Sequence, residues 1–323
     1  MDLASGKRVL TIVVSFCAGF SIYFFLEDPI PHHAKASLSS RQFISSKIIS
    51  SEESGPSTKL ITIAIPPHLL PSENPPNDFD PIWSVYIKDD DIQVERPYTP
   101  LNGLDNSGHM SFWIKKYPKG EVGRWIHTKS PGDGIEIRGP LKTWPWKEDA
   151  LEEIVMISGG TGITPFVQLF NKVISKATPT STTRFTLLHS SRVPQELPPA
   201  LLLEPLLTFS AENPDKFKFQ VFVDEDDGSK APVSIPQINT GRITESALEQ
   251  HLDLKPKRPS WWSRLWRKEA PKDDASRRIL FLVCGPEPMI SAIAGPFGRN
   301  LSQGPVGGIL EKMGYTSSQV YKL

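Results

Sequence analysis

The feature of this sequence that most constrains its fold is a strand pattern that passes through a glycine-rich turn into a helix pattern. Residues 151–158 read LEEIVMIS, which is typical of a buried strand, and residues 159–165 read GGTGITP. Residues 166–177, FVQLFNKVISKA, carry apolar side chains at helical spacing. A strand, a tight turn and a helix in this order form the first half of a crossover unit, so we expect a parallel sheet here.

The rest of the chain after residue 150 repeats this alternation. RFTLLHSS, FKFQVFVDE and RILFLVCGP are further strand patterns, and PMISAIAGPF after the last of them is a helix pattern. We therefore predict an α/β domain with a parallel sheet over residues 150–323.

Residues 43–145 have a different pattern. Short runs rich in β-branched and aromatic residues are separated by Pro, Gly, Asn and Asp, and they read FISSKIIS, KLITIAI, IWSVYI, HMSFWIKKY and DGIEIRGP. Several short strands at this spacing predict a small antiparallel β-barrel. No helix pattern of useful length occurs in this part of the chain.

The N-terminus contains eighteen consecutive residues without a charge, residues 9–26. This length is just enough for a helix to span a bilayer, and we predict a transmembrane anchor over 1–28 with a Pro- and Ser-rich tether over 29–42. The alternative is a cleaved signal peptide, but the run ends in SIYFFLED without a small-residue cleavage pattern. Lys7 and Arg8 precede the run, which predicts that the N-terminal tip lies on the positive-inside face.

Charge and cysteine content exclude some functions. Lys plus Arg and Asp plus Glu both number 36, so the formal net charge is zero, and we expect no nucleic-acid partner. The two cysteines, Cys17 and Cys284, lie far apart, and no cluster has zinc spacing. We therefore expect neither a disulfide framework nor a metal site.

Residues 255–278 interrupt the α/β pattern with a basic, Trp-rich insertion. Trp261, Trp262 and Trp266 alternate with lysines and arginines, a mixture that suits a membrane interface over residues 255–268. An ordinary solvated loop explains the same composition equally well.

Three motifs carry the residue types that chemistry needs. The glycine-rich turn 159–165 lies between a strand and a helix, where backbone N–H groups can meet a phosphate. Cys284 lies at the carboxyl end of a predicted strand, the edge where ligands bind in open α/β sheets. Residues 96–100, RPYTP, combine a guanidinium for a diphosphate, an aromatic ring for a flat heterocycle and a hydroxyl. Each motif also has an ordinary structural explanation. The turn 159–165 could bind no ligand, Cys284 could be a small buried side chain, and residues 96–100 could be a strand whose polar side chains have no function.

Taken together and in order, the motifs are far more specific. RPYTP, IKKY, GEVGRWI, MISGGTGITP and CGPEPM resemble those of the ferredoxin-reductase-type flavoproteins, and most of all the NADH-cytochrome b5 reductases, over about residues 43–323. The resemblance implies an FAD-binding β-barrel over 43–145, an NAD(P)-binding α/β domain over 150–323, and the cofactors FAD and NADH or NADPH.

The resemblance also implies individual roles. Arg96 would bind the FAD phosphates, Tyr98 would contact the flavin, and Thr99 and Cys284 would act where hydride is transferred. Gly123 stands where the family usually has Ser, which removes a hydroxyl from the predicted phosphate loop. The complete set implied for cofactor binding is Arg96, Tyr98, Thr99, Lys115, Tyr117, Glu121, Val122, Gly123, Gly159, Gly160, Thr161, Gly162, Thr164, Pro165, Ser191, Arg192, Cys284, Gly285 and Pro286.

The choice between NADH and NADPH depends on the end of the strand RFTLLHSS. Ser191 and Arg192 there resemble a 2′-phosphate clamp, which favours NADPH, whereas an acidic residue on the ribose would favour NADH. Glu196 is the nearest acidic residue in sequence.

The anchor, the reductase-like body and RPYTPL at 96–101 also resemble fungal mitochondrial FAD proteins of cytochrome c haem attachment. This likeness implies the mitochondrial inner membrane, with the flavin domain in the intermembrane space and a haem protein of the cytochrome c or cytochrome b5 type as electron acceptor. Two alternatives stay open. One is a cytochrome b5 reductase on the outer mitochondrial or endoplasmic reticulum membrane with a cytosolic flavin domain, and the other is a non-enzymatic assembly factor that retains FAD.

Overall fold

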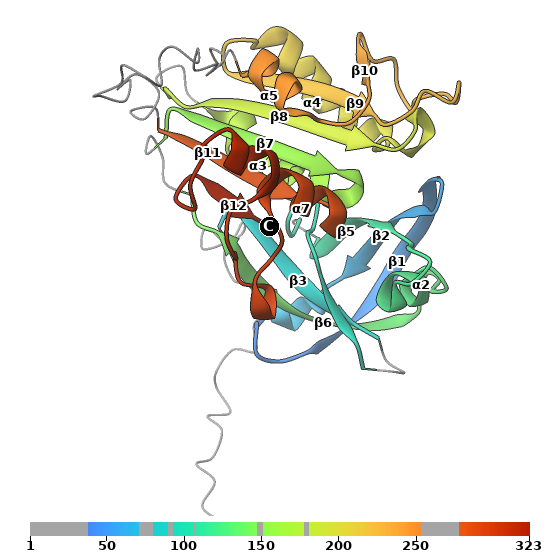
Figure 1. The fold of residues 1–323 in the computed structure, drawn as a ribbon. Coiled ribbons are helices and arrows are strands. Elements are labelled where there is room, and N and C mark those ends of the chain that lie inside the picture. The colour runs from blue at the N-terminus through green and yellow to red at the C-terminus, as the bar shows by residue number, and fades with distance from the viewer. Residues whose placement is uncertain are drawn as a thin grey trace, which may run out of the picture. The chain divides into compact units, whose positions relative to one another are not determined.

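The computed structural model describes residues 38–70, 80–89, 93–105, 107–146, 151–177, 181–252 and 278–323 (Figure 1). Within these ranges, no helix combines the length and the apolar character that a bilayer crossing requires. The predicted anchor at 9–26, the first part of the tether at 29–37 and nearly all of the 255–278 insertion lie outside the described residues.

The first half of the described chain forms a six-stranded antiparallel sheet, as predicted. Its strands pair in the order β4-β3-β6-β1-β2-β5. The bounds are β1 Ile44–Gly55, β2 Thr58–Ala64, β3 Ile82–Lys88, β4 Glu95–Tyr98, β5 His109–Lys115 and β6 Gly134–Trp144. Every run that the sequence marked as a strand here is one.

The two ends of this strand order meet. The backbone N–H of Leu101, just beyond β4, donates to the carbonyl of Ser111 in β5 at 2.8 Å. This bond brings the chain just beyond the first strand of the order against the last strand. Alternate residues such as Ile61 and Ile63 are fully buried inside this sheet.

Part of the predicted tether belongs to this sheet. The carbonyl of Ser39 accepts from the Gly139 N–H at 3.0 Å, and the carbonyl of Ser40 accepts from Arg138 at 2.7 Å. Ser39 and Ser40 are therefore hydrogen-bonded to β6, ahead of the predicted domain boundary at residue 43.

One helix was missed in this half. α2, Glu121–Ile126, occupies the stretch GEVGRW that the sequence suggested was a loop. Its six residues bury Val122, Gly123 and Ile126, so tertiary packing stabilises a segment too short to show a helical period.

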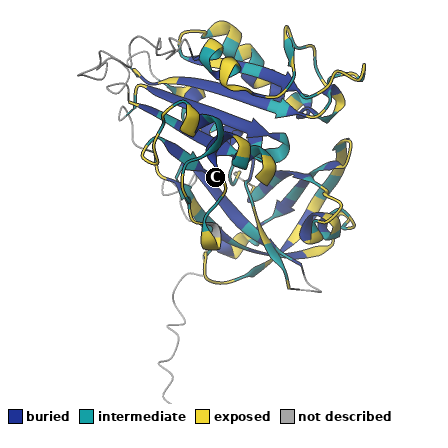
Figure 2. Ribbon diagram, in the orientation of Figure 1, coloured by how far each residue is buried: buried dark blue, intermediate teal, exposed yellow. Residues whose placement is uncertain are grey.

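The second half forms a parallel sheet, again as predicted. The strand order is β10-β9-β8-β7-β11-β12, and all its pairs are parallel. The bounds are β7 Glu153–Gly159, β8 Arg184–Ser191, β9 Phe217–Val223, β10 Ile238–Thr240, β11 Ile279–Cys284 and β12 Val320–Lys322. All seven residues of β7 are buried, because helices cover both faces of this sheet (Figure 2).

The two faces belong to different helices. Ile154 and Met156 of β7 pack in the cluster that holds α3 and α4, whereas Val155 and Ile157 pack in the cluster that holds α5, α7 and α8. The α-helices are α3 Thr164–Lys172, α4 Ala200–Glu212, α5 Glu245–His251, α7 Glu287–Ala294 and α8 Gly308–Lys312. Short 3-10 turns occur at η1 Pro67–Leu69, η2 Gly160–Ile163, η3 Ile174–Lys176, η4 Pro194–Glu196 and η5 Arg299–Leu301.

The sequence did not predict α4, whose interior contains Pro205. Proline normally argues against a helix interior because it removes a backbone hydrogen bond. Here Leu202, Leu203 and Leu206 bury against the sheet, which offsets that loss.

The two sheets are joined through α3. The backbone N–H of Trp83 in β3 donates to Gln168 Oε1 at 2.7 Å, and Gln168 Nε2 donates to the carbonyl of Pro100 at 3.0 Å. Around this buried amide, Leu101 and Trp113 from the first sheet share an apolar cluster with residues of α3 and β7. The junction therefore holds RPYTP in a fixed position relative to the glycine-rich turn.

Candidate functional site

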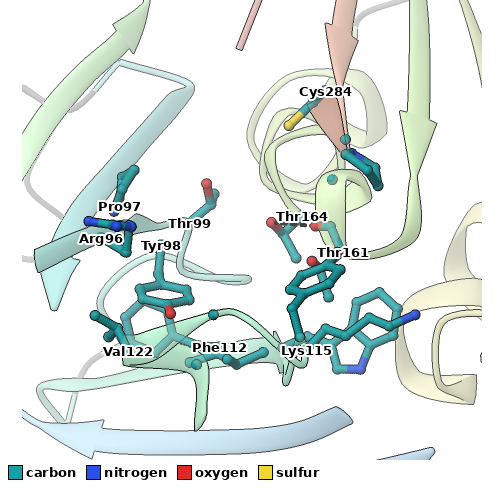
Figure 3. A pocket seen from close by; sticks show the side chains of 18 of the residues that line it. Arg96, Pro97, Tyr98, Thr99, Phe112, Lys115, Val122, Thr161, Thr164 and Cys284 are labelled. Carbon is teal, nitrogen blue, oxygen red and sulfur yellow. Dashed lines mark hydrogen bonds between the residues drawn. The ribbon is translucent and has the colours of Figure 1, made fainter. Parts of the chain in front are cut away.

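A cavity of about 550 Å³ lies where the two sheets meet, and we call it the central pocket (Figure 3). Residues from both halves of the chain form its walls. They are Arg96, Pro97, Tyr98, Thr99, Phe112, Trp113, Ile114, Lys115, Tyr117, Lys119, Gly120, Glu121, Val122, Gly123, Gly159, Thr161, Gly162, Thr164, Pro165, Cys284, Gly285, Pro286 and Glu287. The structure thus brings RPYTP, the β5 end, the α2 segment, the glycine-rich turn and CGP into one site.

The RPYTP stretch forms one wall. Pro97 has no N–H to donate, and β4 tolerates it because this strand pairs only with β3 in the sheet. Burial raises the pKa of Tyr98 to about 12, although the nearby Arg96 charge opposes the shift, so Tyr98 is a protonated phenol at neutral pH. The Arg96 side chain is 59% exposed and lies 3.9 Å from Glu121, which leaves its guanidinium accessible to a ligand.

The glycine-rich turn forms the opposite wall, and close backbone packing explains its composition. A Cβ on Gly162 would lie 2.4 Å from the Cys284 carbonyl oxygen, and a Cβ on Gly285 would lie 3.0 Å from the Gly159 nitrogen. The first distance excludes any side chain at 162, and the second is tighter than most real Cβ contacts. The glycines therefore allow the turn to lie directly against the end of β11.

Two threonines and a tyrosine complete this side of the pocket. Thr164 Oγ1 donates to the Thr161 carbonyl at 3.1 Å. Burial raises the pKa of Tyr117, and a hydrogen bond between the Tyr117 and Thr161 side chains works against that rise. This contact connects the segment after β5 with the turn after β7.

Cys284 ends β11, where it pairs with Ser158 of β7, and Figure 3 shows its sulfur directed toward the pocket. Burial raises the pKa of its thiol to about 12. The side chain is therefore a neutral thiol at physiological pH, suited to contact a ligand rather than to attack one.

α2 lies close beneath the pocket. A Cβ on Gly123 would lie 3.1 Å from the Lys115 carbonyl oxygen and 4.0 Å from the Tyr98 hydroxyl. The missing side chain at 123 thus lets α2 pack tightly against the end of β5.

Three of the predicted binding residues are not in the pocket lining: Gly160, Ser191 and Arg192. Ser191 is 6% exposed, and its hydroxyl lies 3.3 Å from His189 Nε2 and donates to the Glu196 carbonyl at 3.2 Å. Arg192 forms an ion pair with the Glu196 carboxylate through its Nη2 and donates a second bond from Nε at 3.2 Å. Both side chains of the predicted 2′-phosphate clamp are therefore engaged within the protein.

The predicted set lacked seven residues that line the pocket: Pro97, Phe112, Trp113, Ile114, Lys119, Gly120 and Glu287. It also lacked Glu196, which lies outside the lining but binds Arg192. Glu196 also accepts from Lys115 Nζ at 2.7 Å, so its carboxylate bridges a cation of each sheet. Burial pushes the pKa of Glu196 upward, but the hydrogen bonds from Arg192 and Lys115 outweigh that effect and hold it below the ordinary value. The i,i+4 spacing from Arg192 was the one sequence signal for this cluster.

The site fits a dinucleotide with a planar ring. Its volume lies in the range of small-molecule pockets, and its lining includes aromatic rings, hydroxyl groups and the cationic side chains Arg96, Lys115 and Lys119. The glycine contacts leave backbone rather than side chains facing the ligand at the turn. FAD and a nicotinamide nucleotide both satisfy these features.

Comparisons with known proteins agree with this reading. Residues 83–146 match the oxidoreductase FAD-binding domain family, and residues 156–295 match the oxidoreductase NAD-binding domain family. The chain is 34% identical over 237 residues to NADH-cytochrome b5 reductase 2 of Mycosarcoma maydis, covering 73% of this chain and 59% of that protein. It is 30% identical over 230 residues to NADH-cytochrome b5 reductase 2-A of Vanderwaltozyma polyspora, covering 71% and 67%.

A solved structure from a cytochrome b5 reductase domain has a similar fold. The cytochrome b5 reductase domain of Ulva prolifera nitrate reductase superposes with a TM-score of 0.61 at 20% identity, covering 88% of this chain and 99% of that one. The two domain matches, the sequence relatives and the pocket that joins both sheets lead to one conclusion: this chain belongs to the NADH-cytochrome b5 reductase family of FAD- and NAD(P)H-dependent oxidoreductases.

Proposed function

We propose that this protein transfers electrons from NADH through FAD to a haem protein of the cytochrome b5 or cytochrome c type. The observation that carries the proposal is the central pocket, because RPYTP and CGP, far apart in sequence, line the same cavity. The printed names of the relatives, NADH-cytochrome b5 reductase 2, support NADH as donor and a haem protein as acceptor.

We assign the FAD side of the pocket to the first sheet. Arg96 binds the diphosphate, since its exposed guanidinium offers a planar donor fork. Tyr98 packs against the ring system as a neutral phenol, and Thr99 presents its hydroxyl at the reacting edge. FAD, when bound, supplies the chemistry: it accepts two electrons as a hydride and passes them on singly.

The nicotinamide side belongs to the second sheet. Thr161, Thr164 and the neutral thiol of Cys284 form the wall that faces RPYTP (Figure 3). Their role is to hold the nicotinamide ring at the correct distance and to exclude water from the pocket, since orientation contributes much of the rate in such transfers.

The test uses the full-length protein in detergent under anaerobic conditions. We expect a yellow protein whose flavin absorbance falls on addition of NADH, and a haem absorbance change when oxidised cytochrome b5 or cytochrome c follows. A protein that retains no FAD, or whose flavin stays oxidised with both NADH and NADPH, would contradict the proposal. The second result would instead favour the non-enzymatic assembly factor.

For the cellular role we propose haem attachment to cytochrome c, with the uncharged run 9–26 as an inner-membrane anchor and the flavin domain in the intermembrane space. The support is the length of that run and the placement of Lys7 and Arg8 before it. Protease protection of fractionated mitochondria tests this location. A body that is digested with the outer membrane intact would favour the cytosol-facing reductase.

A further inference from the structure

Glu196 binds two cationic side chains, Lys115 at the end of β5 and Arg192 just after β8. Its side chain is 8% exposed, whereas that of Lys115 is 15% exposed and that of Arg192 is 74% exposed. One carboxylate oxygen accepts both from Lys115 at 2.7 Å and from Arg192 Nε at 3.2 Å, and the other accepts from Arg192 Nη2. Two positive charges therefore share one buried negative charge.

The position of Arg192 makes this arrangement relevant to the nucleotide. Arg192 directly follows Ser191, the last residue of β8, and β8 pairs with β7, which leads into the glycine-rich turn. The carboxyl ends of such strands form the edge at which nucleotides bind in α/β sheets. A guanidinium at this edge is the group that would meet a 2′-phosphate if it were available.

Arg192 is already partly engaged, because the Glu196 carboxylate occupies the Nε–Nη2 edge of its guanidinium. Ser191 cannot substitute, since its hydroxyl points inward toward His189 and the Glu196 carbonyl. Both groups that could recognise a 2′-phosphate are thus used internally.

We propose that Glu196 is a specificity-determining residue that makes this site prefer NADH to NADPH by pairing with Arg192 and Lys115. This inference rests on the proposed function for its use of NADH. A 2′-phosphate dianion at this position would meet a guanidinium already paired along its Nε–Nη2 edge and would lie beside a buried carboxylate, and both weaken its binding. NADH lacks that phosphate and leaves the cluster intact.

The test compares binding as well as turnover. Titration calorimetry gives the affinities of 5′-AMP and 2′,5′-ADP for the FAD-loaded protein, and steady-state assays give kcat/KM for NADH and NADPH. Glu196→Gln keeps the side-chain shape but removes the charge, and it frees Arg192. We expect it to shift both ratios toward the 2′-phosphorylated ligand by about tenfold, the worth of one hydrogen bond to a charged group.

Two further variants isolate the cause. Glu196→Gln combined with Arg192→Gln should return the ratios to the wild-type values, because the freed guanidinium is gone. Glu204→Gln, the same chemical change at an exposed position of α4, should leave them unchanged.

Arg192→Gln alone keeps the proposal testable even where Glu196→Gln does not fold. In the wild type Arg192 is already paired with Glu196, so its loss should change the affinity for 2′,5′-ADP by less than about twofold. A clear loss of 2′,5′-ADP binding in Arg192→Gln, an unchanged ratio in a folded Glu196→Gln, or a protein that binds neither nucleotide would overturn the assignment. A wild type that binds nucleotides but oxidises neither NADH nor NADPH would refute the proposed function while the binding ratios still decide the role of Glu196.

Discussion

Replacing Gln168 should weaken the joint between the two sheets more than any other single polar change at that joint. The Gln168 side chain extends from α3 in the second half of the chain and makes two hydrogen bonds to backbone groups of the first half. The residue is 3% exposed, so water cannot replace either bond. Gln168→Leu has nearly the same size and removes both bonds.

The magnitude follows from the two hydrogen bonds that Gln168→Leu removes. The Trp83 N–H and the Pro100 carbonyl lose their Gln168 partner, and each buried unsatisfied polar group costs about 1–3 kcal/mol. We therefore expect Gln168→Leu to lower the free energy of unfolding by about 2–6 kcal/mol. FAD retention should fall with it, since the pocket walls come from both sides of this joint.

Urea unfolding, followed by tryptophan fluorescence and by flavin release, measures this loss. Asn171→Ala is the matched control, because Asn171 lies one turn further along α3 and bonds to Asn102 and Leu101 where solvent has access. Its loss should cost under about 1 kcal/mol. Gln168→Glu adds a second check, because its carboxylate can still accept from the Trp83 N–H but cannot donate to the Pro100 carbonyl. The difference in unfolding free energy between this variant and the wild type should become smaller at acid pH, where the carboxyl group is protonated and can donate. A Gln168→Leu protein no less stable than Asn171→Ala would refute the reasoning.

Three other predictions concern the pocket and its surroundings. Arg96→Ala should weaken FAD binding about tenfold with little change in the unfolding free energy of the apoprotein, as followed by flavin fluorescence on dilution; equal FAD affinity would remove Arg96 from the site. Cys284→Ala should retain FAD yet slow flavin reduction by NADH about tenfold in stopped-flow experiments, because a wall of the nicotinamide side recedes; an unchanged rate would exclude a positioning role. Burial lowers the pKa of His189 to about 3, so only the unfolded chain takes up a proton there as the pH falls below 6.5. Stability should therefore decrease by about 1.4 kcal/mol per pH unit from this residue between about pH 6 and 4, and His189→Gln should lack that component when both proteins are unfolded in urea across the range; parallel pH profiles would contradict it.

Local sequence pattern was sufficient for most of the secondary structure. Strands β1 to β3, β5 to β9 and β11 follow from β-branched and apolar runs between turn residues, and α3 follows from the period of its apolar side chains. The misses have a common cause. α2 is too short to display a period, and α4 contains Pro205, so tertiary burial decided both.

The sequence predicted part of the candidate site, and the tertiary structure was needed for the rest. The ordered motifs RPYTP, GGTGITP and CGP were sufficient to nominate most of the residues that line the central pocket, because each motif carries its chemistry within a few residues. Their spacing along the chain contains no information about the distance between them in space. Only the parallel order that sets β11 beside β7 places Cys284 against Gly162.

The sequence by itself therefore determined the two sheets, the family and the walls of the pocket. Only the tertiary structure decided how the charges pair. Lys115 and Glu196 are 81 residues apart, and no local pattern predicts that one carboxylate meets both Lys115 and Arg192. The sequence suggested that Arg192 binds a phosphate, whereas in the folded chain Arg192 forms an ion pair with Glu196. The physical reason is that the strength of a charge pair depends on the distance between the charges, which the backbone packing sets.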